Sequence, residues 1–169
     1  MKKDKEKIKD TVEVMRHSAA HLLASAILNL YPKTKFGVGP VVENGFYYDM
    51  EIIDKNGKLA QLTTDDLKRI EDKMRELAKK GAEFVRKEMK IDEAIKFFKK
   101  LGQTFKVELL QDIKKKGTTS VKEEDIKAAL GGKKDAVSIY ETGEFVDLCR
   151  GPHVKSTRDI KVFKLHKLA

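Results

Sequence analysis

The sequence predicts an α+β fold in which a largely antiparallel sheet packs around a long buried N-terminal helix, with additional helices. Three features predict it. Apolar residues recur at spacings of three and four between Ile8 and Leu30, which is typical of a helix. Turn signals such as Asn44-Gly45 separate short β-branched and aromatic runs, which favours antiparallel hairpins. The 169 residues are also enough to bury an apolar core without a metal or a disulfide.

The first helix is expected to follow a charged lead-in over residues 1–10 and to end near residues 29–30. Pro32 predicts this end, because the residue before a proline is pushed out of the α region. The helix carries two stripes that can face apolar surroundings, so we expect it to be buried on most sides. The second stripe consists of His17, Ala20, His21, Ala24 and Leu28.

A hairpin is expected after the first helix, with a strand over roughly residues 45–53 and a turn at residues 54–57. Residues 63–66, Thr-Thr-Asp-Asp, combine hydroxyl caps with acids and predict a helix start. Gly81 predicts the end of that helix. We assign residues 54–104 to a largely helical subregion. The apolar face of its first helix is expected at Leu67, Ile70, Met74 and Leu77.

The remaining elements are shorter. Phe84, Val85 and Met89 indicate a strand, which is followed by a short helix that Asp92 caps and Gly102 closes. The alternation of polar and apolar side chains over residues 105–109 predicts another strand. Residues 136–148 contain two strand-like runs joined around Thr142-Gly143.

Residues 111–135 are rich in Lys, Gly, Thr and Asp, and we expect them to form a Lys-rich surface excursion with a short helix at residues 122–130. Apart from the lead-in, residues 11–169 are expected to form one domain.

The charge balance indicates a polyanionic partner. There are 36 Lys and Arg residues against 27 Asp and Glu, and the net charge of +9 favours attraction to RNA. No apolar run approaches the roughly 20 residues that a membrane span needs, so no membrane partner is expected. The single cysteine, Cys149, excludes an internal disulfide and is typical of a reducing compartment, so we expect a cytoplasmic protein.

The sequence concentrates its chemistry in two pairs of residues. His17 and His21 lie four apart on the first helix, which points both imidazoles the same way. Cys149 and His153 are also four apart, but the Gly-Pro step between them excludes a helix interior and predicts a turn. If the turn meets the helix, three imidazoles and one thiol share a pocket. His166 stands alone, and we interpret it as a surface residue.

A pocket of three histidines and one cysteine permits two chemistries. The same side chains suit zinc, which takes imidazole and thiolate ligands in tetrahedral sites. Without metal, they can hold and activate a water molecule by hydrogen bonding and general acid–base transfer. The residue types do not decide between these alternatives.

Three motifs, HSAAHLLASAI, GPVVENGFYYDM and FVDLCRGPHV, make the chain similar to the editing domain of bacterial-type threonyl-tRNA synthetases. This module, also called the second additional domain, is shared with alanyl-tRNA synthetases. The resemblance runs from about Val14 to His166, and NGFYYD and DLCRGPH resemble the threonyl branch. The C-terminal FKLHKLA resembles the point where a full synthetase continues, so the resemblance implies either an excised domain or a free-standing editing protein.

The resemblance implies that the chain hydrolyses the ester of mischarged seryl-tRNA(Thr), as an aminoacyl-tRNA deacylase. The implied partners are the acceptor end of tRNA(Thr) carrying serine and the class II aminoacylation domain of a threonyl-tRNA synthetase, in cis or in trans. No cofactor is required by the threonyl branch, whereas the alanyl relatives resemble zinc binders. We therefore expect no essential metal, with zinc as an option at the histidine and cysteine cluster.

The resemblance also implies the site residues. The catalytic set is His17, His21, Lys106, Cys149 and His153. The substrate-binding set is Tyr48, Asp147 and Arg150. Hydrolysis by direct attack of water is favoured over a covalent thioester on the cysteine. Two other functions stay open: a zinc-stabilised tRNA-binding module without catalysis, and alanyl-type editing of seryl-tRNA(Ala).

Overall fold

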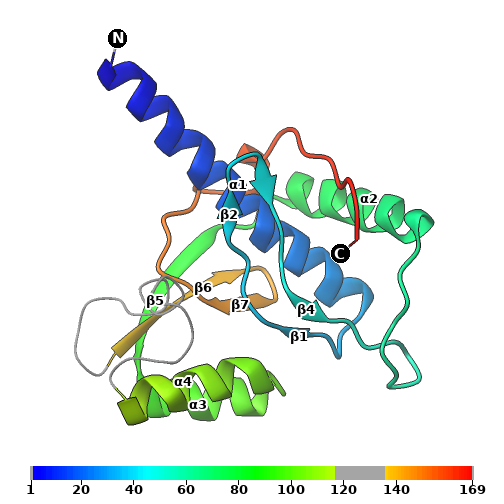
Figure 1. The fold of residues 1–169 in the computed structure, drawn as a ribbon, viewed down its shortest axis with the longest axis vertical. Coiled ribbons are helices and arrows are strands. Elements are labelled where there is room, and N and C mark those ends of the chain that lie inside the picture. The colour runs from blue at the N-terminus through cyan, green and yellow to red at the C-terminus, as the bar shows by residue number, and fades with distance from the viewer. Residues whose placement is uncertain (1, 117–135, 169) are drawn as a thin grey trace.

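The computed structural model describes residues 2–116 and 136–168, and it confirms the predicted α+β class (Figure 1). The helices are α1 (Lys2–Leu30), α2 (Thr64–Lys80), α3 (Ile91–Lys100), α4 (Thr104–Lys116) and the 3₁₀ helix η1 (Thr157–Asp159). The strands are β1 (Lys35–Phe36), β2 (Val41–Val42), β3 (Gly45–Phe46), β4 (Met50–Glu51), β5 (Phe84–Lys90), β6 (Ala136–Thr142) and β7 (Phe145–Leu148).

Helix α1 is the centre of the fold. Figure 1 shows it running between α2 and the three-stranded sheet, so both of its predicted stripes find a partner. The helix ends at Leu30, as predicted from Pro32. It begins at Lys2, so residues 2–10 of the expected lead-in belong to the helix. Its buried residues are Ser18, Ala19, Ala20, His21, Leu22, Ala24, Ser25, Ala26 and Ile27.

All strand pairs among the described residues are antiparallel, as predicted, and they form three small sheets. The expected single strand over residues 45–53 is wrong: β3 pairs with β2, and β4 pairs with β1. Between these pairs residues 37–40 oppose residues 47–49, so the first strand carries one extra residue, as in a bulge. Pro40 in the longer segment has no N–H to donate to a ladder.

Helix α2 begins and ends as predicted. The backbone N–H of Thr63 donates to the Asp66 carboxylate at 2.9 Å, and Gly81 ends the helix with φ of 74°. The predicted cap of α3 is wrong by two residues, because β5 stays paired through Lys90 and the helix begins directly after it. Asp92 lies instead in the first turn of α3, where its charge suits the helix dipole.

The strand predicted over residues 105–109 is wrong, since these residues lie inside α4. The buried side chains on this stretch are Gln103, Lys106, Leu110 and Ile113, a spacing of three and four that belongs to a helix. A window of five residues was too short to distinguish this period from strand alternation.

Gln103 attaches the start of α4 to the strand β1. Its Oε1 accepts a hydrogen bond from the Phe36 N–H, and its Nε2 donates to the Thr34 carbonyl, both at 2.9 Å. The side chain is buried, so its amide supplies hydrogen-bond partners to two backbone groups that water does not reach. This attachment places Lys106, one turn further on, beside the hairpin.

The three-stranded sheet separates two apolar clusters. One cluster joins α1 with α2 and includes Phe145, and the other lies under α3 and α4 and includes Val137, Ile139 and Leu148. Alternation along β7 therefore sends Phe145 toward α1 and Leu148 away from it.

The short helix expected at residues 122–130 lies outside the described residues, while residues 111–116 form the end of α4. In the part of the chain that is described, none of the helices combines the length and the apolar character that crossing a membrane requires.

Candidate functional site

Two histidines of α1 form one side of the site. His17 and His21 are one turn apart, and their ring centroids lie 5.2 Å from each other. His21 is fully enclosed, with its ring edge-on to Phe145, whereas His17 is partly exposed. Small neighbours, Ser18 and Ala20, let the backbone of α1 approach the sheet at this level.

The turn after β7 forms the other side. Cys149 donates its backbone N–H to the Ser138 carbonyl at 3.1 Å, and the Ser138 hydroxyl donates to the Cys149 carbonyl at 2.8 Å, which fixes the cysteine beside β6. Gly151 then adopts φ of 76° and lies against the Tyr140 hydroxyl, where any Cβ would collide. The next peptide, to Pro152, is cis, and the chain turns so that His153 lies over α1.

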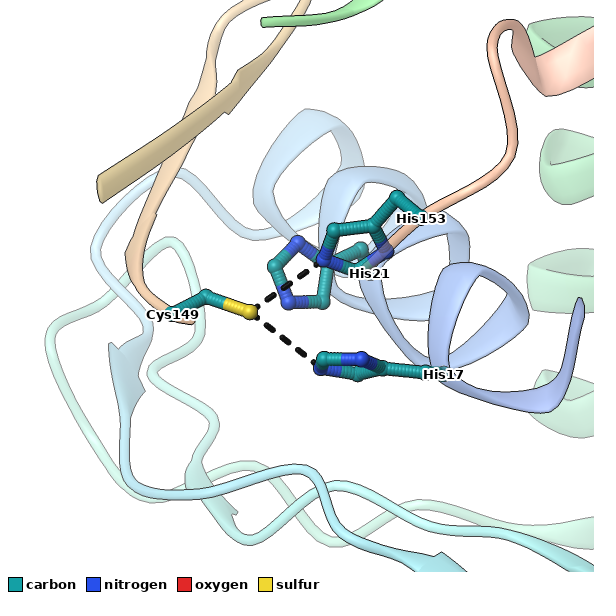
Figure 2. A group of neighbouring side chains, drawn as sticks. All are labelled: His17, His21, Cys149 and His153. Atoms are coloured by element: carbon teal, nitrogen blue, oxygen red, sulfur yellow. Dashed lines mark hydrogen bonds between the residues drawn. The ribbon is translucent and has the colours of Figure 1, made fainter. Parts of the chain in front are cut away.

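The structure brings all four residues together, as Figure 2 shows. The sulfur of Cys149 lies 3.2 Å from Nε2 of His17 and 3.2 Å from Nε2 of His153. One ligand atom from each of His17, His21, Cys149 and His153 falls within 4.8 Å of the others. We call these four side chains the His/Cys cluster.

A second group of polar side chains lies next to this cluster. The Asp147 carboxylate accepts a hydrogen bond from the Tyr48 hydroxyl and forms an ion pair with Lys106. Lys106 also donates to the Gly37 carbonyl at 2.5 Å. His21 joins the two groups, because its Nε2 lies 3.4 Å from the Asp147 carboxylate. We call Tyr48, Lys106 and Asp147 the buried polar triad.

Arg150 is the one predicted site residue that lies in neither group. Its side chain is exposed on the turn next to Cys149. The predicted placement of Cys149 on the strand face that carries Asp147 is present, since both side chains are buried on the α1 side of the sheet.

Burial controls the protonation of the His/Cys cluster. Loss of hydration lowers the pKa of His17 and of His153, and it places the pKa of His21 well below its usual value. For His153, the neighbouring imidazoles of His21 and His17 add to this effect. Burial, reinforced by the charge of Asp147, raises the pKa of the Cys149 thiol to about 12. Near neutral pH the cluster therefore holds neutral imidazoles and a protonated thiol.

The same residues fit a metal ion. In a tetrahedral zinc site the Zn–N and Zn–S bonds place neighbouring ligand atoms about 3.3–3.6 Å apart. The two sulfur-to-nitrogen separations of 3.2 Å are close to this value, while the four ligand atoms together lie within 4.8 Å of one another, so the imidazoles would have to move closer together around an ion. Geometry alone therefore permits a zinc centre as well as a hydrogen-bonded cluster of metal-free side chains.

Three residues that hold His153 in place were not predicted as site residues from the sequence. The Ser18 hydroxyl lies 3.1 Å from Nδ1 of His153, the Phe84 ring stacks on the imidazole at 4.8 Å, and the Tyr140 ring meets it edge-on at 4.5 Å. Ser18 follows His17 directly in the HSAAH motif, so a hydroxyl within the histidine pair was the available signal.

Comparison with known proteins relates the chain to one group of enzymes. Residues 137–168 match the family described as the threonyl and alanyl tRNA synthetase second additional domain. Over 156 residues, 92% of this chain, the threonine–tRNA ligase of Geobacillus sp. (strain WCH70) is 44% identical, and the match covers 20% of that relative. The threonine–tRNA ligases of Coxiella burnetii and Polynucleobacter asymbioticus are 43% and 45% identical over 164 residues, 97% of this chain and 22% of each relative. The chain thus spans about a fifth of the length of the curated relatives it matches.

Proposed function

We propose that the chain carries the second additional domain of threonyl and alanyl tRNA synthetases, and that it is an aminoacyl-tRNA editing domain that hydrolyses seryl-tRNA(Thr). The observation that carries the proposal is the convergence of the His/Cys cluster, in which ligand atoms from two distant segments lie within 4.8 Å. We assign this activity to residues 11–169 as one domain.

A physical need explains such an activity. Serine is threonine without one methyl group, and a difference of this size is worth only about 1–3 kcal/mol in a binding pocket. An aminoacylation site alone therefore charges some serine onto tRNA(Thr). A second site that admits serine and excludes threonine supplies the missing discrimination.

The reaction assigned to the site is attack of water on the ester carbonyl. The bond from the carbonyl carbon to the ribose oxygen breaks, and that oxygen takes up a proton. The imidazoles of His17, His21 and His153, kept neutral by burial, offer lone pairs that orient the water and accept its proton. Lys106 supplies positive charge for the developing oxyanion, while Asp147 and Tyr48 contact the amino acid. Arg150, on the exposed side of the turn, contacts the RNA.

Direct attack by water is favoured over a thioester on Cys149. A cysteine nucleophile acts as the thiolate, and its reactivity requires a lowered pKa. Here burial raises the pKa of the thiol to about 12, so thiolate is scarce at neutral pH. We assign Cys149 to shaping the pocket and positioning the water.

A basic hollow supports an RNA partner. It is a cavity of about 660 Å³ between α2, η1 and the C-terminal segment, and none of the described residues that line it is acidic. Its cationic residues are Arg75, Lys79, Arg158 and Lys161, of which Arg75 forms ion pairs with Glu71 and Asp72. A concentration of cations attracts phosphate, and the net charge of +9 acts in the same direction. We propose tRNA(Thr) and a synthetase aminoacylation domain, in cis or in trans, as the partners, and the cytoplasm as the location.

The His/Cys cluster also supports a second candidate, a zinc-stabilised RNA-binding module without catalysis. This candidate predicts one zinc per chain and a large fall in melting temperature on chelation, because metal binding is then part of the folding free energy. The proposed editing function requires no metal. A chelated sample that stays folded and hydrolyses its substrate excludes the zinc-stabilised module.

The deciding experiment offers the purified chain three esters: seryl-tRNA(Thr), seryl-tRNA(Ala) and glycyl-tRNA(Ala). Zinc content is measured on the same sample. We expect release of serine from tRNA(Thr) and loss of that activity in His153→Ala. Faster hydrolysis of the tRNA(Ala) esters would assign the chain to alanyl-type editing, and no hydrolysis of any ester contradicts the proposal.

A further inference from the structure

We propose that Ser18 is a positioning residue that fixes His153 as the tautomer with its proton on Nδ1, leaving the Nε2 lone pair directed into the His/Cys cluster. The geometry that carries this assignment is a hydrogen-bond hub at the Ser18 hydroxyl. The hydroxyl is fully buried, so water cannot substitute for any of its partners.

Three groups surround the Ser18 oxygen. It lies 2.8 Å from the Val14 carbonyl, 3.0 Å from the Val154 N–H and 3.1 Å from Nδ1 of His153. A serine hydroxyl has one proton to donate and two lone pairs to accept with. The carbonyl can only accept and the N–H can only donate, so two of the three interactions have a fixed direction.

The direction of the third interaction follows. The one hydroxyl proton is used by the Val14 carbonyl, the shorter of the two contacts that can take it. With that proton used, His153 completes the hub as a donor, with the proton on Nδ1, and all three neighbours are paired. If Nδ1 carried the lone pair instead, the hydroxyl proton would have to turn from the Val14 carbonyl at 2.8 Å to Nδ1 at 3.1 Å, and the carbonyl would keep only the hydrogen bond that it accepts from the Ser18 N–H within α1.

The assignment determines what His153 presents to the site. A neutral imidazole with its proton on Nδ1 has an unprotonated Nε2, and this atom lies 3.2 Å from the Cys149 sulfur. It can accept a hydrogen bond from the thiol or from a water molecule. The stacked ring of Phe84 and the edge-on ring of Tyr140 hold the plane of the imidazole, and Ser18 selects which nitrogen faces inward.

The tautomer itself does not depend on the proposed function, but its consequence for the rate does. For histidines that bind a metal, removal of the orienting partner commonly lowers activity by about 10- to 100-fold, and we expect the same range here. We expect Ser18→Ala to lower kcat for seryl-tRNA(Thr) by this factor with little change in KM, since Ser18 does not touch the substrate.

The matched control is Ser25→Ala. Ser25 lies on the same helix, is also buried, and donates to the His21 carbonyl at 2.9 Å, so it has the same bond to the preceding turn. Among the described residues, no hydrogen bond joins the Ser25 hydroxyl to the ring of His153. A loss caused only by weakening α1 affects both variants, whereas the proposed role affects only Ser18→Ala.

The closing experiment reads the tautomer directly, by two-bond ¹H–¹⁵N NMR of the histidine rings in the 169-residue chain, with His153→Gln to assign the signals. We expect Nδ1 of His153 protonated and Nε2 unprotonated in the unsubstituted chain and in Ser25→Ala, and the opposite tautomer or a mixture in Ser18→Ala. A protonated Nε2 in the unsubstituted chain overturns the proposal even if Ser18→Ala fails to fold, and so does a folded Ser18→Ala with an unchanged tautomer. Absence of seryl-tRNA(Thr) hydrolysis, with the expected tautomer present, contradicts the proposed function and leaves the assignment of the proton standing.

Discussion

The buried polar triad makes a quantitative prediction about stability. The side chains of Lys106 and Asp147 are 4% and 5% exposed, and they pair with each other. Removing one partner of such a pair leaves a buried charge without compensation, which costs about 3–5 kcal/mol. We therefore expect Lys106→Met to lower the free energy of unfolding by about that amount.

The double variant Lys106→Met/Asp147→Leu removes both charges of the pair. When both charges are removed and apolar groups of similar volume replace them, the desolvation cost disappears with the attraction, and stability is often restored. We expect the double variant to be more stable than Lys106→Met alone, although both lose hydrolytic activity.

The assay is urea denaturation at equilibrium, and the control is Lys87→Met. Lys87 pairs with Glu141 at 2.5 Å, but these side chains are 51% and 31% exposed. An exposed pair of this kind contributes less than about 1 kcal/mol. If Lys106→Met costs no more than Lys87→Met, Lys106 is not held in a buried pair, and the charge placement at the site is refuted.

Three further predictions concern the turn, the imidazoles and the basic hollow. Gly151→Ala should cost about 1–3 kcal/mol in thermal or urea unfolding, because its φ of 76° and the Tyr140 hydroxyl leave no room for a Cβ, whereas Gly45→Ala has open space and should cost less. Folding lowers the pKa of His17, His21 and His153, so protonation of these imidazoles favours the unfolded chain. The free energy of unfolding should therefore reach its full value above pH about 6.5 and fall below that pH by up to about 1.4 kcal/mol per pH unit for each imidazole. A free energy of unfolding that stays constant down to pH about 5 in chelated protein contradicts this. Replacing Lys79 and Lys161 by Ala should reduce the slope of log K for tRNA binding against log salt by about one unit for each phosphate that is no longer neutralised, and an unchanged slope removes the hollow from the RNA interface.

Much of the fold follows from local signals in the sequence. The end of α1 before Pro32, the start of α2 at Thr63 and its end at Gly81 each depend on backbone chemistry within a few residues, and the structure has them where predicted. Residues 105–109 show the limit of such reasoning. Their alternation over five positions matched a strand, and only the wider spacing from Gln103 to Ile113 indicates the helix that the structure contains.

The four residues of the His/Cys cluster could be predicted from the sequence, but the contacts that orient them could not. Two pairs of residues at a spacing of four, one on a helix and one on a turn, predicted that the four side chains meet, and the structure places one ligand atom of each within 4.8 Å of the others. The hydrogen bonds of Ser18 and the stacking of Phe84 on His153 depend on how the turn lies against α1. No pattern of neighbouring residues in the sequence predicts how the turn packs against α1.

We propose that the His/Cys cluster forms one hydrolytic site that separates serine from threonine on tRNA(Thr). The most direct measurement is the ratio of single-turnover deacylation rates for seryl-tRNA(Thr) and threonyl-tRNA(Thr) with the purified chain. We expect serine to be released about 10- to 200-fold faster than threonine, the range that one methyl group allows. Equal rates on the two esters, or no release of serine at all, would contradict it.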